Sequence, residues 1–262
     1  MGRVAEGRER GSFYNRLYKS PLGLGLAILY AALTASGTAC RGDTPEMISA
    51  QQAYEAAKAR YQTNATNDAT ARQFASACFD RADLADKDSV RATVAHEGIQ
   101  VCRLWLQRAP EQGAAHYYLG MNLAQLARTK SLGALPLVKE MEKEWLATVA
   151  LDPHCDYAGA DRNLGLLYRD APGFPLSIGS HAKAEKSLQH AVELNPEYPE
   201  NHLNLIETNL KRKSAAVAGE FEKLRAILPA ARKRFSGPQW QSAWEDWNPR
   251  LERIQSRLPA AP

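Results

Sequence analysis

The chain has 262 residues, 45% of them hydrophobic and 24% charged, which is enough for one large or two small domains with a sizeable core. Leu and Ala dominate, and alternating apolar patterns are nearly absent, so the composition predicts an all-α fold. Residues 1–39 hold five of the 33 basic and two of the 29 acidic residues, which leaves 28 basic against 27 acidic residues in the body. This balance lacks the positive excess expected of a nucleic-acid-binding protein.

The N-terminus has the three-part order of an export signal. A basic region ends at Lys19, a mostly apolar run extends from Leu22 to Ala35, and small residues follow up to Cys40. Residues 37–39 resemble a bacterial lipobox, in which the following Cys is lipidated. We therefore expect residues 1–39 to be a signal or membrane-targeting segment, and Cys40 to be the lipid attachment site. Cleavage by an ordinary signal peptidase and an uncleaved anchor are the alternatives, and each of the three exports the body.

Three prolines, Pro110, Pro153 and Pro196, follow similar apolar helical segments at a constant spacing of 43 residues. A short polar link and a new helical segment come after each of them. Because proline cannot continue a helix, each one fixes where a helix ends. This pattern predicts residues 40–68 as an N-terminal helix and linker and residues 69–262 as a helical-repeat domain. Its hairpins are expected at about 69–110, 111–153, 154–196 and 197–235, with a C-terminal cap over 236–262.

The repeated segments resemble the tetratricopeptide repeat. Residues 164–168 read LGLLY, which is similar to the first-helix motif of that repeat, and Ala184, Leu188, Ala191 and Pro196 are in register with its second helix. The resemblance implies an α-solenoid of antiparallel hairpins. Small residues in these motifs allow two helices to cross closely.

A standard tetratricopeptide repeat has about 34 residues, so a 43-residue spacing leaves extra chain inside each hairpin. We expect enlarged turns between the two helices, one near residues 131–136 and one over residues 170–180. The second turn contains Phe174, Leu176 and Ile178, and we predict that it forms an interaction surface at one edge of the array. The alternative is a capping loop whose apolar side chains cover the end of the hairpin.

The two ends of the array differ from its centre. Thr44 is expected to cap a helix that begins with Pro45. Trp240, Trp244 and Trp247 have the spacing of one helical face, and we expect them to cover the C-terminal end of the stack.

The sequence contains no recognisable catalytic or metal-binding constellation. The six His residues are scattered, no cysteine spacing resembles a zinc site, and no phosphate-binding loop or nucleophile motif is present. We therefore predict that the protein is not an enzyme and takes no metal or cofactor. Cys78 and Cys102 fall on the two helices of one hairpin, so either two buried thiols or a disulfide fits the pattern.

A binding surface is then the expected functional site. In tetratricopeptide arrays the first helix of each hairpin lines the inner, concave face, and a mixture of aromatic, aliphatic and arginine side chains there suits an extended peptide. The register predicts a partner-binding groove lined by Tyr117, Met121, Arg162, Leu166, Arg169, Asn204 and Glu207.

Residues 115–209 also resemble a more particular family, exported lipoproteins grouped with the T component of tripartite TRAP-type transporters. The similarity lies in HYYLGMNLAQLARTKSLGAL, DYAGADRNLGLLYRDAPGFPLSIGS and AVELNPEYPENHLNLIE. It implies a periplasmic, lipid-anchored scaffold without catalysis that forms oligomers and works with a periplasmic substrate-binding subunit. A carrier of a small hydrophobic or organic-acid ligand and an envelope-assembly chaperone are the rival hypotheses.

Overall fold

A computed structural model describes residues 44–130 and 133–258, so the predicted signal segment and Cys40 lie outside the described residues. The described part consists of helices joined by short links. The α-helices are α2 (Pro45–Thr63), α3 (Asp68–Asp83), α4 (Asp88–Arg108), α5 (Gly113–Arg128), α6 (Leu135–Leu151), α7 (Gly159–Asp170), α8 (His181–Leu194), α9 (Pro199–Lys211), α10 (Ala216–Arg234) and α11 (Gln241–Gln255), and a 3-10 turn, η1 (Pro238–Trp240), precedes α11.

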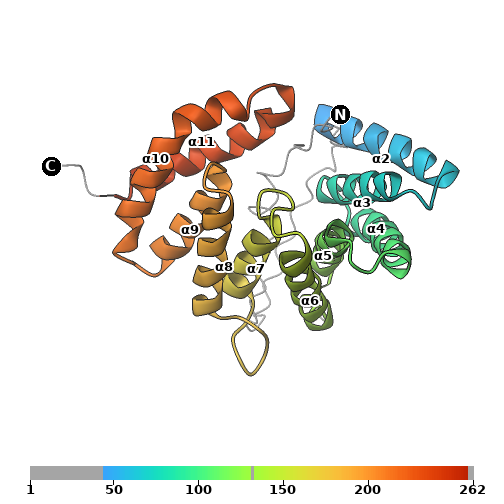
Figure 1. The fold of residues 1–262 in the computed structure, drawn as a ribbon, viewed down its shortest axis with the longest axis horizontal. Coiled ribbons are helices and arrows are strands. Elements are labelled where there is room, and N and C mark those ends of the chain that lie inside the picture. The colour runs from blue at the N-terminus through green and yellow to red at the C-terminus, as the bar shows by residue number, and fades with distance from the viewer. Residues whose placement is uncertain (1–43, 131–132, 259–262) are drawn as a thin grey trace, which may run out of the picture.

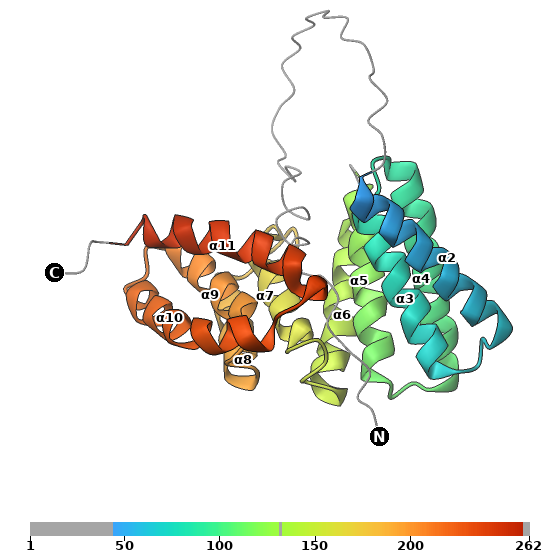
Figure 2. The ribbon, with the colours of Figure 1, turned by 90° about the horizontal axis from the view of Figure 1, so that it is seen from above.

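The helices form successive antiparallel hairpins arranged along an arc. After α2 come α3–α4, α5–α6, α7–α8 and α9–α10, and α11 packs on α9 at the C-terminal end. Figure 1 shows α2 at one end of the arc and α10 and α11 at the other, with α3, α5 and α7 nearer its inside than α4, α6 and α8. The view from above shows the same order along the array (Figure 2). The predicted all-α solenoid of helical hairpins is therefore confirmed.

The helix ends follow the predicted signals. The hydroxyl of Thr44 accepts a hydrogen bond from the backbone N–H of Met47, and Pro45 occupies the first position of α2, as expected. The helices α4, α6 and α8 end two residues before Pro110, Pro153 and Pro196, respectively. Each repeat proline therefore marks a helix end.

Two glycines lie where helices approach closely. A Cβ atom on Gly120 of α5 would overlap the indole ring of Trp145 on α6. A Cβ atom on Gly165 of α7 would overlap Leu188 on α8, beside the fully buried Ala184. The small residues of the repeat motif thus bring each pair of antiparallel helices together, as the sequence predicted.

The extra length of the two central repeats is distributed differently. In the third hairpin it forms the turn over residues 171–180, because α7 and α8 have 12 and 14 residues. In the second hairpin α5 and α6 have 16 and 17 residues, and the turn between them spans residues 129–134. Longer helices therefore take up most of the additional residues there.

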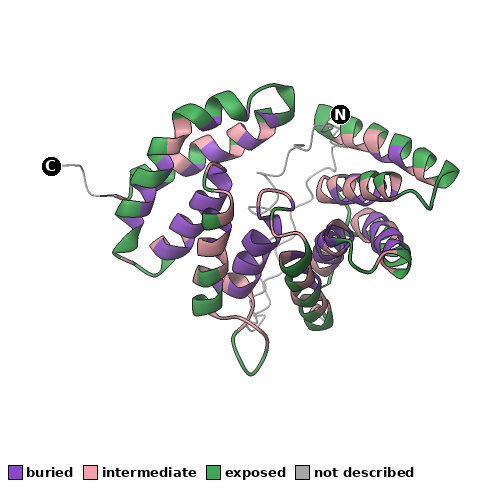
Figure 3. Cartoon of the chain, in the orientation of Figure 1, coloured by how far each residue is buried: buried purple, intermediate pink, exposed green. Residues whose placement is uncertain are grey.

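The buried apolar residues divide into two main clusters. The larger cluster, from Tyr54 to Ala184, joins α2 through α7 and the start of α8, and a second cluster, from Tyr198 to Ile254, joins α9, α10, η1 and α11. Between them lies a small group formed by Leu188, Val192 and Leu205. Figure 3 shows buried residues along the whole arc and exposed residues on its outer surfaces and at its ends.

The C-terminal tryptophans cover the end of the array, but they do not share one helix. Trp240 belongs to η1, whereas Trp244 and Trp247 belong to α11. Trp247 is fully buried, and its ring lies 5.5 Å from that of Tyr198 and 6.3 Å from that of Phe235. The aromatic residues of the tail therefore complete the second apolar cluster.

Candidate binding face

The predicted groove residues lie on α5, α7 and α9, but most of them are buried. Leu166 is 0% exposed, and Tyr117, Met121, Arg162 and Asn204 are each 1% exposed. Arg169 and Glu207 are partly exposed. The five buried side chains therefore do not form an open groove surface.

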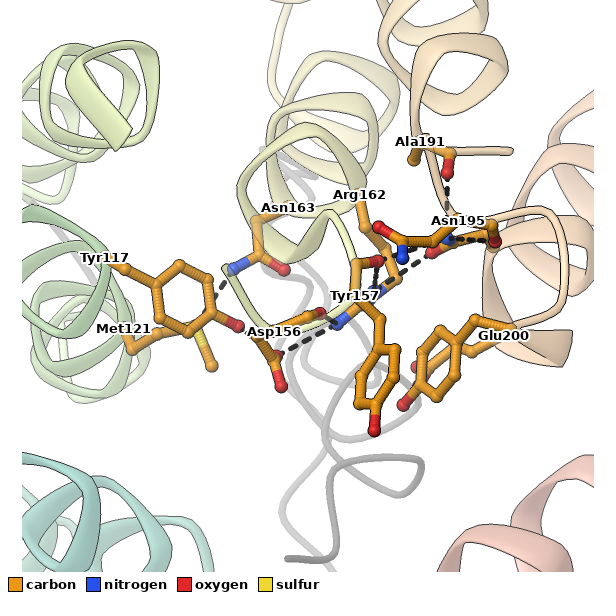
Figure 4. A network of polar contacts seen from close by, with 11 residues as sticks. Tyr117, Met121, Asp156, Tyr157, Arg162, Asn163, Ala191, Asn195 and Glu200 are labelled. Atoms are coloured by element: carbon orange, nitrogen blue, oxygen red, sulfur yellow. Dashed lines mark hydrogen bonds and ion pairs between the residues drawn. The ribbon is translucent and has the colours of Figure 1, made fainter. Parts of the chain in front are cut away.

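Arg162 is the centre of a polar network that we call the polar joint, formed with Tyr117, Asp156, Asn201 and Glu200. Figure 4 shows Tyr117, Asp156 and Glu200 around Arg162. The guanidinium donates to Oδ2 of Asp156 at 3.1 Å and to Oδ1 of Asn201 at 3.0 Å. The hydroxyl of Tyr117 donates to the same Asp156 oxygen at 2.5 Å. These bonds connect α5, the link before α7, α7 itself and α9.

The link before α7 has an unusual backbone that places two of these groups. Asp156, Tyr157 and Ala158 have φ angles of 52°, 55° and 61°, in the left-handed region that residues with a Cβ rarely adopt. The carbonyl of Tyr157 accepts from Arg162 Nη1 at 3.1 Å and from Asn201 Nδ2 at 3.1 Å. These hydrogen bonds help to hold the left-handed turn.

The charged groups of the polar joint are buried, and neighbouring charges oppose the effect of burial on their pKa values. Burial by itself would lower the pKa of Arg162, but Glu200, Tyr198 and Asp156 outweigh it and raise that pKa above its ordinary value. Burial raises the pKa of Glu200 to about 7, against the opposing effect of Arg162 and Arg250. Glu200 accepts from the Tyr198 hydroxyl at 3.3 Å, and its Oε1 has no hydrogen-bond partner among the described residues.

Replacing Glu200 by Gln is expected to change how stability depends on pH. Between about pH 4.5 and 7 the folded chain holds a proton on Glu200 that the unfolded chain releases, so this group lowers stability as pH rises through that window. The Glu200→Gln variant should lose that slope and gain on the order of 2 kcal/mol at pH 8. Urea unfolding across this range measures both effects. The exposed Glu222→Gln change is the matched control, and an unchanged slope in Glu200→Gln would contradict the assignment.

Asn204 and Glu207 on α9 bind Arg250 of α11 instead of lining a groove. The guanidinium of Arg250 donates to Oδ1 of Asn204 at 2.6 Å and to both carboxylate oxygens of Glu207, at 2.9 and 2.8 Å. It also pairs with Asp246 at 3.0 Å. These two predicted groove residues therefore fasten the C-terminal cap to the last hairpin.

Each of the last three hairpins contains one His–carboxylate pair between its two helices. His116 Nδ1 lies 2.6 Å from Glu144, and His202 Nδ1 lies 2.8 Å from Glu220. In the hairpin α7–α8 the carboxylate lies on the first helix and the histidine on the second, and Asp161 of α7 lies 2.8 Å from His190 of α8. Three of the six histidines that looked scattered in the sequence thus have equivalent structural roles in successive hairpins.

The other ring nitrogen of two of these histidines faces a backbone carbonyl. His116 Nε2 lies 2.9 Å from the oxygen of Pro110, and His202 Nε2 lies 2.7 Å from that of Pro196. Because a carbonyl oxygen only accepts, Nε2 of each ring is the donor in this contact. The hydrogen bond from His202 lowers the pKa of Glu220, against the effect of its burial. His116 and His202 follow Pro110 and Pro196 at the same spacing, and this was the sequence signal that could have revealed these two pairs.

Several buried polar side chains on the first helices retain atoms without a hydrogen-bond partner in the described part of the chain. They include Asn122 Oδ1 on α5, Asn163 Oδ1 on α7, and Asn204 Nδ2 and Thr208 Oγ1 on α9. Asn163 and Asn204 occupy the same place in consecutive hairpins, directly before Leu164 and Leu205. Leaving such a polar group unpaired costs about 1–3 kcal/mol, so these positions lower the stability of the array.

The predicted edge loop has two exposed members and one partly buried member. Phe174 is 93% exposed and Leu176 is 66% exposed. Ile178 packs against the larger apolar cluster. The loop thus combines the two alternatives, because one side chain covers the hairpin while the other two point away from it.

Cys78, Cys102 and Cys155 are buried free thiols. Burial raises the pKa of the first two, which keeps them protonated and unreactive at neutral pH. The structure therefore agrees with the interpretation of Cys78 and Cys102 as small buried residues.

The described residues belong to the class of all-α helical-repeat proteins built from stacked antiparallel hairpins. No helix among them is both long enough and apolar enough to span a bilayer. No protein-family model and no curated protein matches the chain. A solved structure described as "MamA RS-1 ArsTM double mutant" is similar over 71% of this chain and 88% of its own, with 22% sequence identity and a TM-score of 0.47.

Proposed function

We propose that this chain is a non-enzymatic scaffold that binds an extended segment of a protein partner along the first helices of its hairpins. The observation that carries the proposal is the arrangement of the hairpins along an arc, which places α5 and α7 on its inner side, with the partly exposed Arg169 on α7. An extended segment is a suitable partner for such an inner face, because it can run along the array and contact successive first helices.

The finer assignment is also a proposal. The three segments that resemble the T component of TRAP-type transporters support an accessory role in such a system, with a periplasmic substrate-binding subunit as the partner. The order of residues 1–40 supports export and lipid attachment at Cys40, which would hold the scaffold at a membrane in the periplasm. Self-association into a homo-oligomer belongs to the same proposal. Mass spectrometry of the mature N-terminus tests the lipid, and an unmodified chain that begins upstream of Cys40 would exclude it.

Crosslinking in the native envelope, followed by identification of the crosslinked peptides, tests the scaffold proposal. We expect peptides of one partner joined to α5, α7 or α9, and we expect Arg169→Ala to weaken that capture severalfold, because Arg169 is a partly exposed side chain on α7. Arg103→Ala is the matched control, because Arg103 is an exposed arginine on α4, on the outer side of the arc. Recovery of the chain alone with a co-purifying lipid or small acid would instead favour the ligand-carrier hypothesis.

A further inference from the structure

The turn between α7 and α8 is closed at its base by backbone hydrogen bonds. The N–H of Gly179 donates to the carbonyl of Pro172 at 2.9 Å, and that of Ser180 donates to Tyr168 at 2.8 Å. Within the turn, the N–H of Leu176 donates to Gly173 at 3.0 Å. Figure 1 shows the turn projecting beyond the ends of the neighbouring helices. It therefore presents its tip in a fixed conformation.

The tip exposes more apolar surface than any comparable part of the described chain. Phe174 and Leu176 are 93% and 66% exposed, whereas the other exposed large apolar side chains range from 43% to 49%. Full exposure of an aromatic ring on an ordered loop is unfavourable in water, and such patches commonly mark contact surfaces.

Basic side chains outnumber acidic ones at the helix ends next to this turn. The end of α7, the first turns of α8, and the end of α9 with the residues after it carry six basic side chains, Arg169, Lys183, Lys186, Lys211, Arg212 and Lys213. The acidic side chains among or paired with them are Asp170, Glu185 and Glu142 of α6.

The acidic members of this group are already engaged. Asp170 pairs with Arg169 at 2.5 Å and with Lys211 at 3.4 Å, and Glu185 pairs with Arg212 at 2.5 Å. Glu142 lies 3.5 Å from Lys183. Lys186 and Lys213 are exposed and form no ion pair within the described residues. The excess is local, because the body of the chain is nearly neutral.

We propose that this edge docks on an anionic lipid surface, with Phe174 and Leu176 at the boundary between head groups and acyl chains. A protruding aromatic and aliphatic pair bordered by unpaired lysines has the two components that bind such a surface, apolar insertion and attraction to anionic head groups. A convex tip suits a deformable bilayer boundary, which needs no matching pocket. The proposal is independent of the binding face on the first helices and adds a second contact to the proposed scaffold.

A polarity-sensitive dye on the loop tests the insertion. The full chain carries Cys40→Ser and Ser177→Cys, and the three remaining thiols are buried, so an NBD label reacts at position 177. Vesicles of phosphatidylcholine mixed with phosphatidylglycerol should shift the emission to the blue and increase it, and neutral phosphatidylcholine vesicles should not. The dye reports its own position, so attachment through residues 1–39 alone gives no signal.

Substitutions separate the two components. Phe174→Ser with Leu176→Ser should abolish the dye response, and Lys186→Gln with Lys213→Gln should weaken vesicle affinity on the order of tenfold, since each lysine near an anionic surface contributes about 1 kcal/mol. Leu104→Ser with Leu151→Ser removes two less exposed apolar side chains elsewhere and should leave the response unchanged.

Three results would overturn the proposal. They are no response to anionic vesicles, an equal response after Phe174→Ser with Leu176→Ser, and a photocrosslinker at Leu176 that captures a discrete protein in the native envelope without lipid. The last outcome would identify the edge as a protein-docking surface.

Discussion

Replacing Arg162 by Met should lower the free energy of unfolding by about 3–5 kcal/mol, because it removes one partner of a buried ionic network. The substitution keeps most of the side-chain volume but leaves Asp156 and Glu200 without their nearest counter-charge in the polar joint. It also removes the hydrogen bond to Asn201 and those to the left-handed link, so α7 and α9 lose their main polar connection. Urea denaturation at neutral pH measures the loss.

Two further variants test the cause of this loss. Arg225→Ala removes an exposed arginine paired with Glu222 on α10, and it should change stability by less than about 0.5 kcal/mol. Glu200→Gln should stabilise the Arg162→Met background by more than it stabilises the unaltered chain, because the uncompensated carboxylate is then absent. If Glu200→Gln has the same effect on stability in both backgrounds, the charge argument fails and the loss reflects packing.

Replacing Trp247 by Ala should also lower the free energy of unfolding by about 3–5 kcal/mol. The ring is fully buried and contacts Tyr198, Phe235, Trp240 and Trp244, so its removal opens a cavity in the second apolar cluster. Hydrogen exchange should show the effect by region. Amides of α9, α10 and α11 should lose protection, while those of α3 to α5 keep it, because the two clusters are separate.

Trp247→Phe is the control for size, since a smaller aromatic ring preserves much of the contact and should cost less than the alanine change. An equal loss of protection along the whole arc in Trp247→Ala would contradict the division into two clusters. It would show that the cap stabilises every hairpin to the same degree.

The fold was largely predictable because its signals are local and repeated. Proline ends each repeat helix, and glycine or alanine permits close crossing, so Pro153 and Gly165 identify a hairpin without knowledge of distant residues. Trp240 was the exception, because Pro238 starts a 3-10 turn that separates it from α11.

Most of the predicted groove residues are buried for a physical reason. Register identifies which helix a residue lies on, but it does not reveal a partner such as Arg250, which lies 43 residues beyond Glu207 and binds it. The polar joint depends on the left-handed link at residues 156–158. Glycine is the residue that usually indicates such a backbone, but these residues are Asp, Tyr and Ala, so the sequence did not predict it. Arg162 therefore resembled a surface arginine in the sequence although it is buried.

The polar joint also has a mechanical consequence for the array. Apolar contacts are non-directional, so two hairpins held by them alone can rotate slightly against each other at little cost. Hydrogen bonds lose strength steeply when their angles change, and those from Arg162 and Asn201 span α7, its preceding link and α9. These hydrogen bonds therefore resist bending of the arc at this point, and their angles act together with the packed side chains to set the curvature of the inner face there.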